Sequence, residues 1–135
     1  MAVKFSVAVR NARLDALETA IGTSAVLKIR SGSAPTNITD ADSGTVLATL
    51  SLPSDWMANA ASGSKSKSGT WQDTSADNTG TAAHFRLYAS DGTTPHMHGS
   101  ITATGGGGDM TVDNTSFVTG QSFTVTAFTL TDGNG

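Results

Sequence analysis

The first helix is predicted by the spacing of apolar residues between positions 7 and 21. Four of them recur on one side of a helix, namely Val7, Leu14, Leu17 and Ile21. Ser6 can accept a hydrogen bond from an unpaired N–H of the first turn, and Gly22 suits the position just past the last turn. The charged residues lie largely off the apolar side, at Arg10, Arg13, Asp15 and Glu18. This pattern predicts a helix that packs one face on an apolar surface and turns its charges to solvent.

Two half-buried strands follow. Residues 25–30 alternate, with Ala25, Leu27 and Ile29 pointing one way and the other three residues pointing to the opposite face. Residues 45–52 alternate in the same manner, and Pro53 ends the strand. We expect residues 53–57 to form a turn that places Trp56 on the end of the core. Residues 59–68 are small and polar, which predicts an exposed loop, and Trp71 begins a short strand at a sheet edge.

A long hairpin is predicted from residue 81 to residue 103. Phe85, Leu87 and Ala89 are expected to face the core, whereas His84, Arg86 and Tyr88 are expected to face outward. The returning strand carries its histidines on the outward face. In the last strand, from residue 123 to residue 130, the apolar residues change parity after Ala127. A change of phase within one strand predicts a β-bulge there.

The elements together predict a mainly β protein. Seven or eight strands with turn residues at short intervals indicate an antiparallel β-sandwich or jelly-roll-like domain with one N-terminal helix. We expect residues 1–24 to form an arm and the helix, and residues 25–135 to form a single β-sandwich domain. A chain of 135 residues fits one domain of this size.

Composition narrows the classes of function. The formal net charge is −3 and the pI is about 5.4, so no general attraction to nucleic acid or anionic lipid is expected. The chain has no cysteine, and its longest N-terminal apolar run is too short for a signal peptide or a membrane span. We therefore expect a protein that is made and folded in the cytoplasm, binds no cofactor and can be incorporated into a particle.

The histidines are the best candidates for a metal site. His96 and His98 alternate on one strand and so project from one face, with His84 opposite them in the hairpin. Their spacing fixes no third ligand, and an exposed His-x-His is ordinary surface, so no metal is expected. Asp40 and Asp42 weakly resemble a calcium loop, but the glutamate that completes such a loop is absent.

No catalytic signature is present. The single glutamate and the turn aspartates do not predict the pair of carboxylates that a glycosidase needs. The Gly-x-Ser-x-Gly motif of serine hydrolases does not occur. The four glycines at 105–108 are not followed by a predicted helix, so they do not form a phosphate-binding loop. A metal-dependent enzyme on the histidine face is a minority hypothesis. The interpretation from the residues alone is a protein that is not an enzyme.

Several segments resemble a family of small structural proteins encoded by tailed bacteriophages. The resemblance is carried by residues 9–17 (VRNARLDAL), 27–35 (LKIRSGSAP), 44–48 (GTVLA), 74–82 (TSADNTGTA), 84–87 (HFRL) and 122–128 (SFTVTAF). These are turns and strand cores, and they cover nearly the whole chain. The resemblance implies a virion protein, with a head decoration or cement protein that stabilises the capsid as the leading hypothesis. The alternative is a neck or tail accessory protein that binds a receptor or a glycan.

Either the helix with its N-terminal arm, residues 1–5, or the loop of residues 59–69 is expected to contact other virion proteins. The predicted partners are the major capsid protein or other virion proteins, and the protein itself is expected to be a homo-oligomer. The predicted interface residues are Phe5, Val7, Arg10, Leu14, Leu17, Ile21, Lys65, Lys67 and Trp71.

Overall fold

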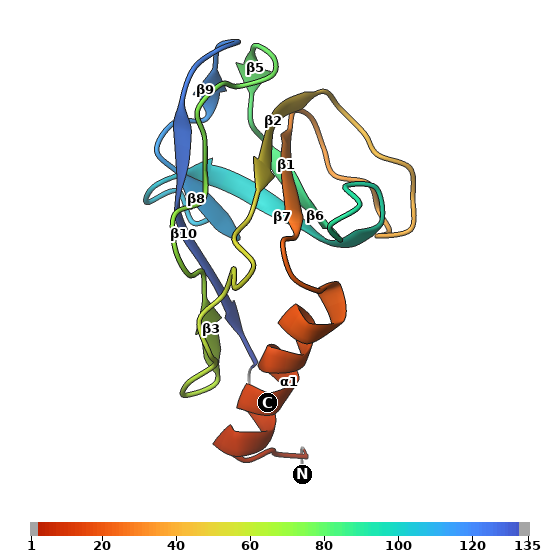
Figure 1. Cartoon of the computed structure of the whole chain (residues 1–135), viewed down its shortest axis with the longest axis vertical. Coiled ribbons are helices and arrows are strands. Elements are labelled where there is room, and N and C mark those ends of the chain that lie inside the picture. The colour runs from red at the N-terminus through yellow and green to blue at the C-terminus, as the bar shows by residue number, and fades with distance from the viewer. Residues whose placement is uncertain (1–2, 133–135) are drawn as a thin grey trace.

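A computed structural model describes residues 3–132, which form one N-terminal helix and a curled β-sheet (Figure 1). Residues 1 and 2 of the predicted arm lie outside the described residues. The elements are α1 (Val7–Ile21), β1 (Val26–Arg30), β2 (Val46–Ser51), β3 (Ser64–Ser66), β4 (Gln72–Asp73), β5 (Gly80–Thr81), β6 (His84–Tyr88), β7 (Pro95–Ala103), β8 (Met110–Val112), β9 (Ser116–Phe117) and β10 (Phe123–Thr131). The predicted class, a mainly β sandwich-like domain with one N-terminal helix, is confirmed.

The main sheet has the strand order β2-β1-β6-β7-β8-β10-β3, with β4 also paired to β10, while β5 and β9 form a separate ribbon. Every pair is antiparallel except β7 and β8, which run parallel. Six residues join these two strands, whereas parallel neighbours usually need a dozen or more. Glycines make the short return possible, because a Cβ at Gly106 or Gly108 would lie 2.7 Å or 2.9 Å from the Thr102 side chain.

The core lies within the curl of the sheet and is closed at one end by aromatic side chains. Trp56 is fully buried, as expected, and its Nε1 donates to the carbonyl oxygen of Gly22 at the end of α1. The Trp71 ring lies between Trp56 and Phe128, with centroids 6.1 Å and 5.7 Å away. This contact ties the end of the helix to β10.

Local predictions along the chain are largely confirmed. The helix spans residues 7–21, the Ser6 hydroxyl accepts from the N–H of Val9, and Gly22 ends the helix at φ +96°. The pairing of β10 with β8 shifts register between Val125 and Ala127, where the change of phase predicts a bulge.

Two predictions of exposure are wrong. Residues 59–68 are not an open loop, since they contain β3, which pairs with β10 and buries Lys65. His84, Arg86 and Tyr88 do not face solvent either, because the segment from residue 31 to residue 44 folds over the outer face of β6 and buries all three. In both places a polar loop covers charged side chains that alternation alone assigns to solvent.

Candidate assembly surface

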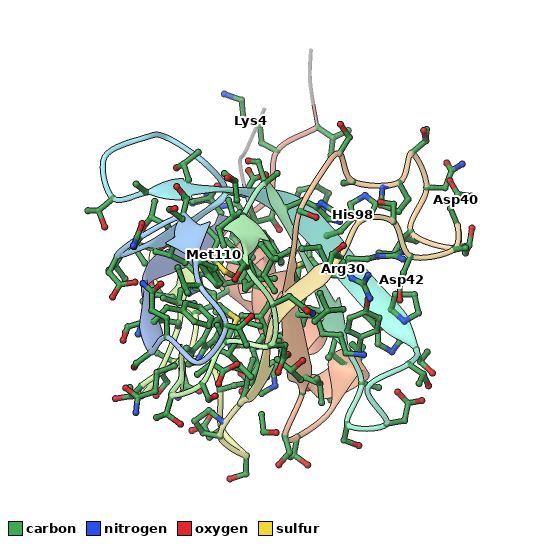
Figure 2. All side chains as sticks on the ribbon, turned by 90° about the horizontal axis from the view of Figure 1, so that it is seen from above. Lys4, Arg30, Asp40, Asp42, His98 and Met110 are labelled. Carbon is green, nitrogen blue, oxygen red and sulfur yellow. The ribbon has the colours of Figure 1, made fainter. Side chains whose placement is uncertain are left out.

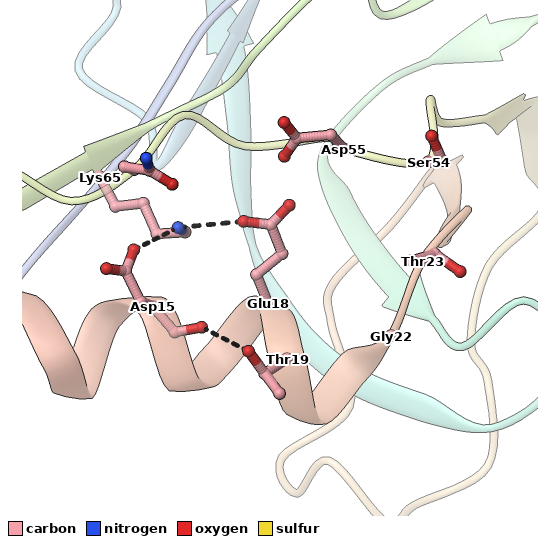
Figure 3. Close-up of a pocket in the computed structure, with 9 residues that line it drawn as sticks. Asp15, Glu18, Thr19, Gly22, Thr23, Ser54, Asp55 and Lys65 are labelled. Atoms are coloured by element: carbon pink, nitrogen blue, oxygen red, sulfur yellow. Dashed lines mark hydrogen bonds and ion pairs between the residues drawn. The ribbon is translucent and has the colours of Figure 1, made fainter.

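The two carboxylate side chains of α1, Asp15 and Glu18, meet Lys65 on β3 (Figure 3). The Lys65 ammonium lies 2.7 Å from Asp15 Oδ1 and 3.0 Å from Glu18 Oε2, and it also donates to the carbonyl oxygen of Ala58. Burial works to lower the pKa of Lys65, but the hydrogen bonds and charges of the two carboxylates outweigh it and raise the pKa above its ordinary value. The hydrogen bond from Lys65 likewise lowers the pKa of Asp15. Lys65 and Asp15 are therefore both ionised at neutral pH.

The same face of the helix also binds the backbone around β3. Asp15 Oδ1 accepts from the N–H of Ala60, and Glu18 Oε1 accepts from the N–H of Met57. One turn earlier, Asn11 Oδ1 accepts from the N–H of Gly63. These side chains satisfy donors that a short strand leaves unpaired, so the polar face of α1 holds the segment that sequence patterns assign to an open loop.

A cavity of about 520 Å³ opens beside this ion cluster, between the end of α1 and residues 54–59 (Figure 3). Its polar lining includes Asp55 and Asn59 as well as the cluster of Asp15, Glu18 and Lys65. A lysine that acts as a base or nucleophile needs a lowered pKa, and that of Lys65 is raised. The arrangement suits a structural ion pair better than a reacting centre.

The outer face of α1 is almost without charge. Alanines recur every fourth residue along it, at Ala8, Ala12, Ala16 and Ala20, and all four are exposed. The exposed large apolar side chains of the described residues are Val3, Phe5, Val7, Val9, Leu17 and Val118. Five of these six lie in the arm or on the helix. Arg13 is the one charged residue on this face, where it lies between Val9 and Leu17 along the helix. Its side chain is 55% exposed, pairs with Asp132 and lies over the Phe5 ring.

We call the exposed residues of the helix the outer face of α1, comprising Val7, Ala8, Val9, Ala12, Arg13, Ala16, Leu17, Thr19 and Ala20. A helix on the surface of a soluble protein normally turns its charges to water and its apolar residues inward. In α1, Leu14 and Ile21 follow this rule, but Asp15 and Glu18 bind Lys65, and three large apolar side chains are left exposed. The four-residue alanine spacing is visible in the sequence and marks this face, but its meaning depends on where the charged residues point.

The predicted interface residues divide into three groups. Leu14, Ile21, Lys65 and Trp71 are buried within the chain, so their side chains offer no surface to a partner. Arg10 and Lys67 are half-buried and donate to carbonyl oxygens of Asp132 and Gly69. Phe5, Val7 and Leu17 are exposed, at 42%, 47% and 40%. The exposed group falls on the arm and the outer face of α1.

A second charged cluster lies on β1 and β6, beneath residues 31–44, and Figure 2 shows Arg30 and Asp42 of it. Arg30 on β1 and Arg86 on β6 both bind the carboxylate of Asp42, which also accepts from the Tyr88 hydroxyl. The two guanidinium groups also donate to carbonyl oxygens of the covering segment, including those of Ile38 and Ser43. Although partial burial opposes it, these partners lower the pKa of Asp42. The cluster fixes the covering segment on the sheet.

The three histidines do not form a common ligand set. His84 is buried at this cluster, with Nδ1 2.7 Å from the carbonyl oxygen of Gly32, while His96 is exposed and His98 half-buried. Among residues 3–132 no group of three or more metal-ligating side chains is close enough to hold an ion. Burial lowers the pKa of His84, although the Gly32 hydrogen bond opposes this, and the nearby Arg30, His98 and Arg86 lower it further. This cationic surrounding disfavours a metal cation.

No family model, curated protein or solved structure matches the chain. Among the described residues, no helix has the length and apolar character needed to cross a membrane. The candidate surface therefore rests on its own geometry, which is an exposed and mainly apolar face of a helix that is tied to β3 through the buried Lys65.

Proposed function

We propose that the protein is a non-enzymatic structural subunit of a tailed-bacteriophage virion, which attaches to the head as a decoration or cement protein through the outer face of α1. The observation that carries the proposal is the exposed side of α1, which is a row of alanines with Val9, Leu17 and the single charge of Arg13. The helix carboxylates bind Lys65 inside the chain. An exposed apolar surface on an otherwise polar protein marks an interaction site. The sequence resemblance supports the virion as the place where the partner is found.

The mechanism is added contact rather than chemistry. A protein that binds the assembled shell and not its free subunits stabilises the shell by mass action. Symmetric copies multiply a modest contact into high avidity. Alanines suit this role, because small side chains let the helix approach a partner surface closely. The inward ion cluster keeps the helix in place while its outer face binds.

The copy number of this chain in purified virions tests the proposal. Quantitative mass spectrometry against the major capsid protein is expected to give a ratio near that of the shell subunit. A few copies per particle would indicate that the protein lies at the neck or tail instead of the head, and the receptor- or glycan-binding alternative would then apply. Absence from purified virions would overturn the virion proposal.

A matched pair of substitutions tests the surface. Val9→Glu introduces a charge on the outer face of α1, where Val9 is 44% exposed, and is expected to abolish incorporation into particles. Val118→Glu alters an equally apolar residue, 57% exposed, beyond β9 and far from the helix (Figure 1). It is expected to leave incorporation unchanged. Equal incorporation of both folded variants would contradict the assignment of this face.

A further inference from the structure

The sheet has a gap one strand wide between β7 and β10. β8 fills the space between them only where Ile101–Ala103 pair with Met110–Val112, and its pairing with β10 ends at Phe128. The first half of β7 has β6 on one side, and the end of β10 has β3 on one side. Within residues 3–132 no strand pairs with the other side of either segment. Two unpaired strand edges therefore flank the gap.

Backbone donors and acceptors point into this gap from β7. The N–H of Ile101 donates to Ala83, so in an antiparallel pair residues 101, 99 and 97 bond to β6 and the alternate residues point away. Ser100 confirms this alternation, because its N–H points away from β6 and donates to Oδ2 of Asp109, the residue just before β8. The backbone groups of His98 therefore face the gap.

β10 presents the matching edge. The carbonyl oxygen of Phe128 accepts from Lys67, and the N–H of Asp132 donates to Gly63, so the even-numbered residues bond toward β3. By the same alternation the N–H and C=O of Thr129 face the gap. An extended segment placed here would find hydrogen-bond partners on β7 and on β10, which is the requirement for strand addition.

The gap is also a cavity of about 250 Å³ with an apolar floor and a polar rim. Its floor is made by Phe85, Met97, Phe128 and Leu130, of which Met97 and Leu130 are only partly buried. Asp109, exposed at the rim, and His98 supply the polar lining. A strand with apolar residues at alternate positions would bury them on this floor and turn the residue between them toward the rim.

The arm before α1 has this pattern. Val3 and Phe5 alternate with Lys4, and Val3 is 77% exposed. Among the described residues Lys4 is the one lysine or arginine that forms neither a hydrogen bond nor an ion pair. Figure 2 shows its side chain pointing away from the rest of the molecule. An unpartnered cation between two apolar residues complements an apolar floor with Asp109 at its rim.

We propose that residues 3–5 of one copy insert as a strand into the β7–β10 gap of a second copy, with Val3 and Phe5 on the apolar floor and Lys4 toward Asp109. The inference deepens the proposed function, on which it rests for its biological setting, by naming the contact between neighbouring subunits. Donor and acceptor are different surfaces, so the contact is heterologous and links copies head to tail into rings or chains. In the free protein the Phe5 ring lies under Arg13 of its own helix, 5.0 Å from the guanidinium carbon. On insertion the Phe5 ring would leave this partly exposed contact with Arg13 and become buried on the floor of the gap.

The experiment uses engineered cysteines in the full chain, which has none of its own. Lys4→Cys and Thr129→Cys proteins are mixed and oxidised, and cross-linked heterodimer is quantified on a non-reducing gel. Both positions point to the rim in the proposed complex, and Thr129 is exposed. The control pairs Lys4→Cys with Val118→Cys, an exposed residue outside the gap. We expect heterodimer with Thr129→Cys to form at least about tenfold faster than with the control, because insertion raises the local thiol concentration.

Equal rates for the two mixtures of folded proteins would overturn the proposal. A second test uses one protein that carries both Lys4→Cys and Thr129→Cys. If its disulfide forms within the chain instead of between chains, the arm occupies the gap of its own subunit and the proposal is overturned. A third protein, Lys4→Cys with Val3→Ser and Phe5→Ser, is expected to lose the rapid cross-link, and a rate that does not fall contradicts the apolar insertion. These outcomes are independent of virion copy number, so failure here and failure of the proposed function are distinguishable.

Discussion

Replacing Lys65 by methionine tests whether the buried ion cluster holds α1 on the sheet. The Lys65 side chain is only 1% exposed. Methionine keeps most of its length and apolar volume but removes the ammonium group. Glu18, with a side chain 19% exposed, then loses its counter-ion while it stays against the protein. Removing one partner of a fully buried pair costs about 3–5 kcal/mol. Because both carboxylates keep a backbone N–H donor and some contact with water, we expect a loss of about 2–3 kcal/mol.

The assay is urea denaturation at neutral pH. For a domain of this size the expected loss moves the midpoint down by about 1–2 M. Lys67→Met is the matched control, because the Lys67 ammonium has only the carbonyl oxygen of Gly69 as its partner, and we expect a change below about 0.5 kcal/mol. Adding Asp15→Asn and Glu18→Gln to Lys65→Met should recover part of the loss, since neutral amides need no counter-ion. The reasoning is refuted if Lys65→Met costs no more than Lys67→Met.

Three further predictions concern the loop, the buried histidine and the helix cap. Gly44→Ala should lower the free energy of unfolding by at least about 2 kcal/mol in urea denaturation, because the new Cβ would lie 1.8 Å from the Ser31 carbonyl oxygen. The control Gly32→Ala, at a similar φ but with nothing within 4 Å of the new Cβ, should lower it by about 1 kcal/mol. Equal losses would exclude the close contact as the cause. Because the pKa of His84 is lowered in the folded protein, the unfolded chain binds a proton at this histidine more readily than the folded protein does. The contribution of neutral His84 to the free energy of unfolding is therefore fully present above pH 6.5 and is lost as the pH falls below it. Denaturation series across this range should show a smaller fall for His84→Asn, and an unchanged fall would exclude His84 as the cause. Ser6→Ala should cost about 1 kcal/mol by loss of the cap, and Ser6→Asp should retain it; thermal denaturation that does not separate the two would contradict the capping role.

The sequence predicts those parts of the fold that depend on neighbours along the chain. The helix caps at Ser6 and Gly22 and the bulge near Ala127 are local features, and each is confirmed. The parallel pairing of β7 and β8 is not predicted, because it depends on how the glycines at 105–108 fold back over Thr102. Sequence spacing marks a turn there but does not give its direction.

The candidate surface is predicted only in part, and the reason is electrostatic. Phe5, Val7 and Leu17 are exposed, whereas helical periodicity assigns Val7 and Leu17 to the packed face with Leu14 and Ile21, so the prediction is wrong for these two residues. Lys65 of the predicted interface is buried. Alternation and helical periodicity assign charged residues to solvent, and that assignment fails where a distant residue neutralises them. Asp15 and Lys65 are 50 residues apart, and Arg86 and Asp42 are 44 apart. No local pattern reports such pairs.

These two ion clusters explain how a protein with many Thr, Ser and Ala residues can have an exposed helix face with one charged residue, Arg13. Each cluster removes cations from the surface, with Lys65 bound beneath α1 and Arg30 and Arg86 bound beneath the covering segment. Ion pairs at these places add less stability than apolar residues of equal volume would, but they fix which side of a helix or loop faces inward. For α1 the consequence is that the alanine side must face outward. A helix held in this orientation keeps an apolar surface available in the free subunit, which is what binding to a preassembled shell requires.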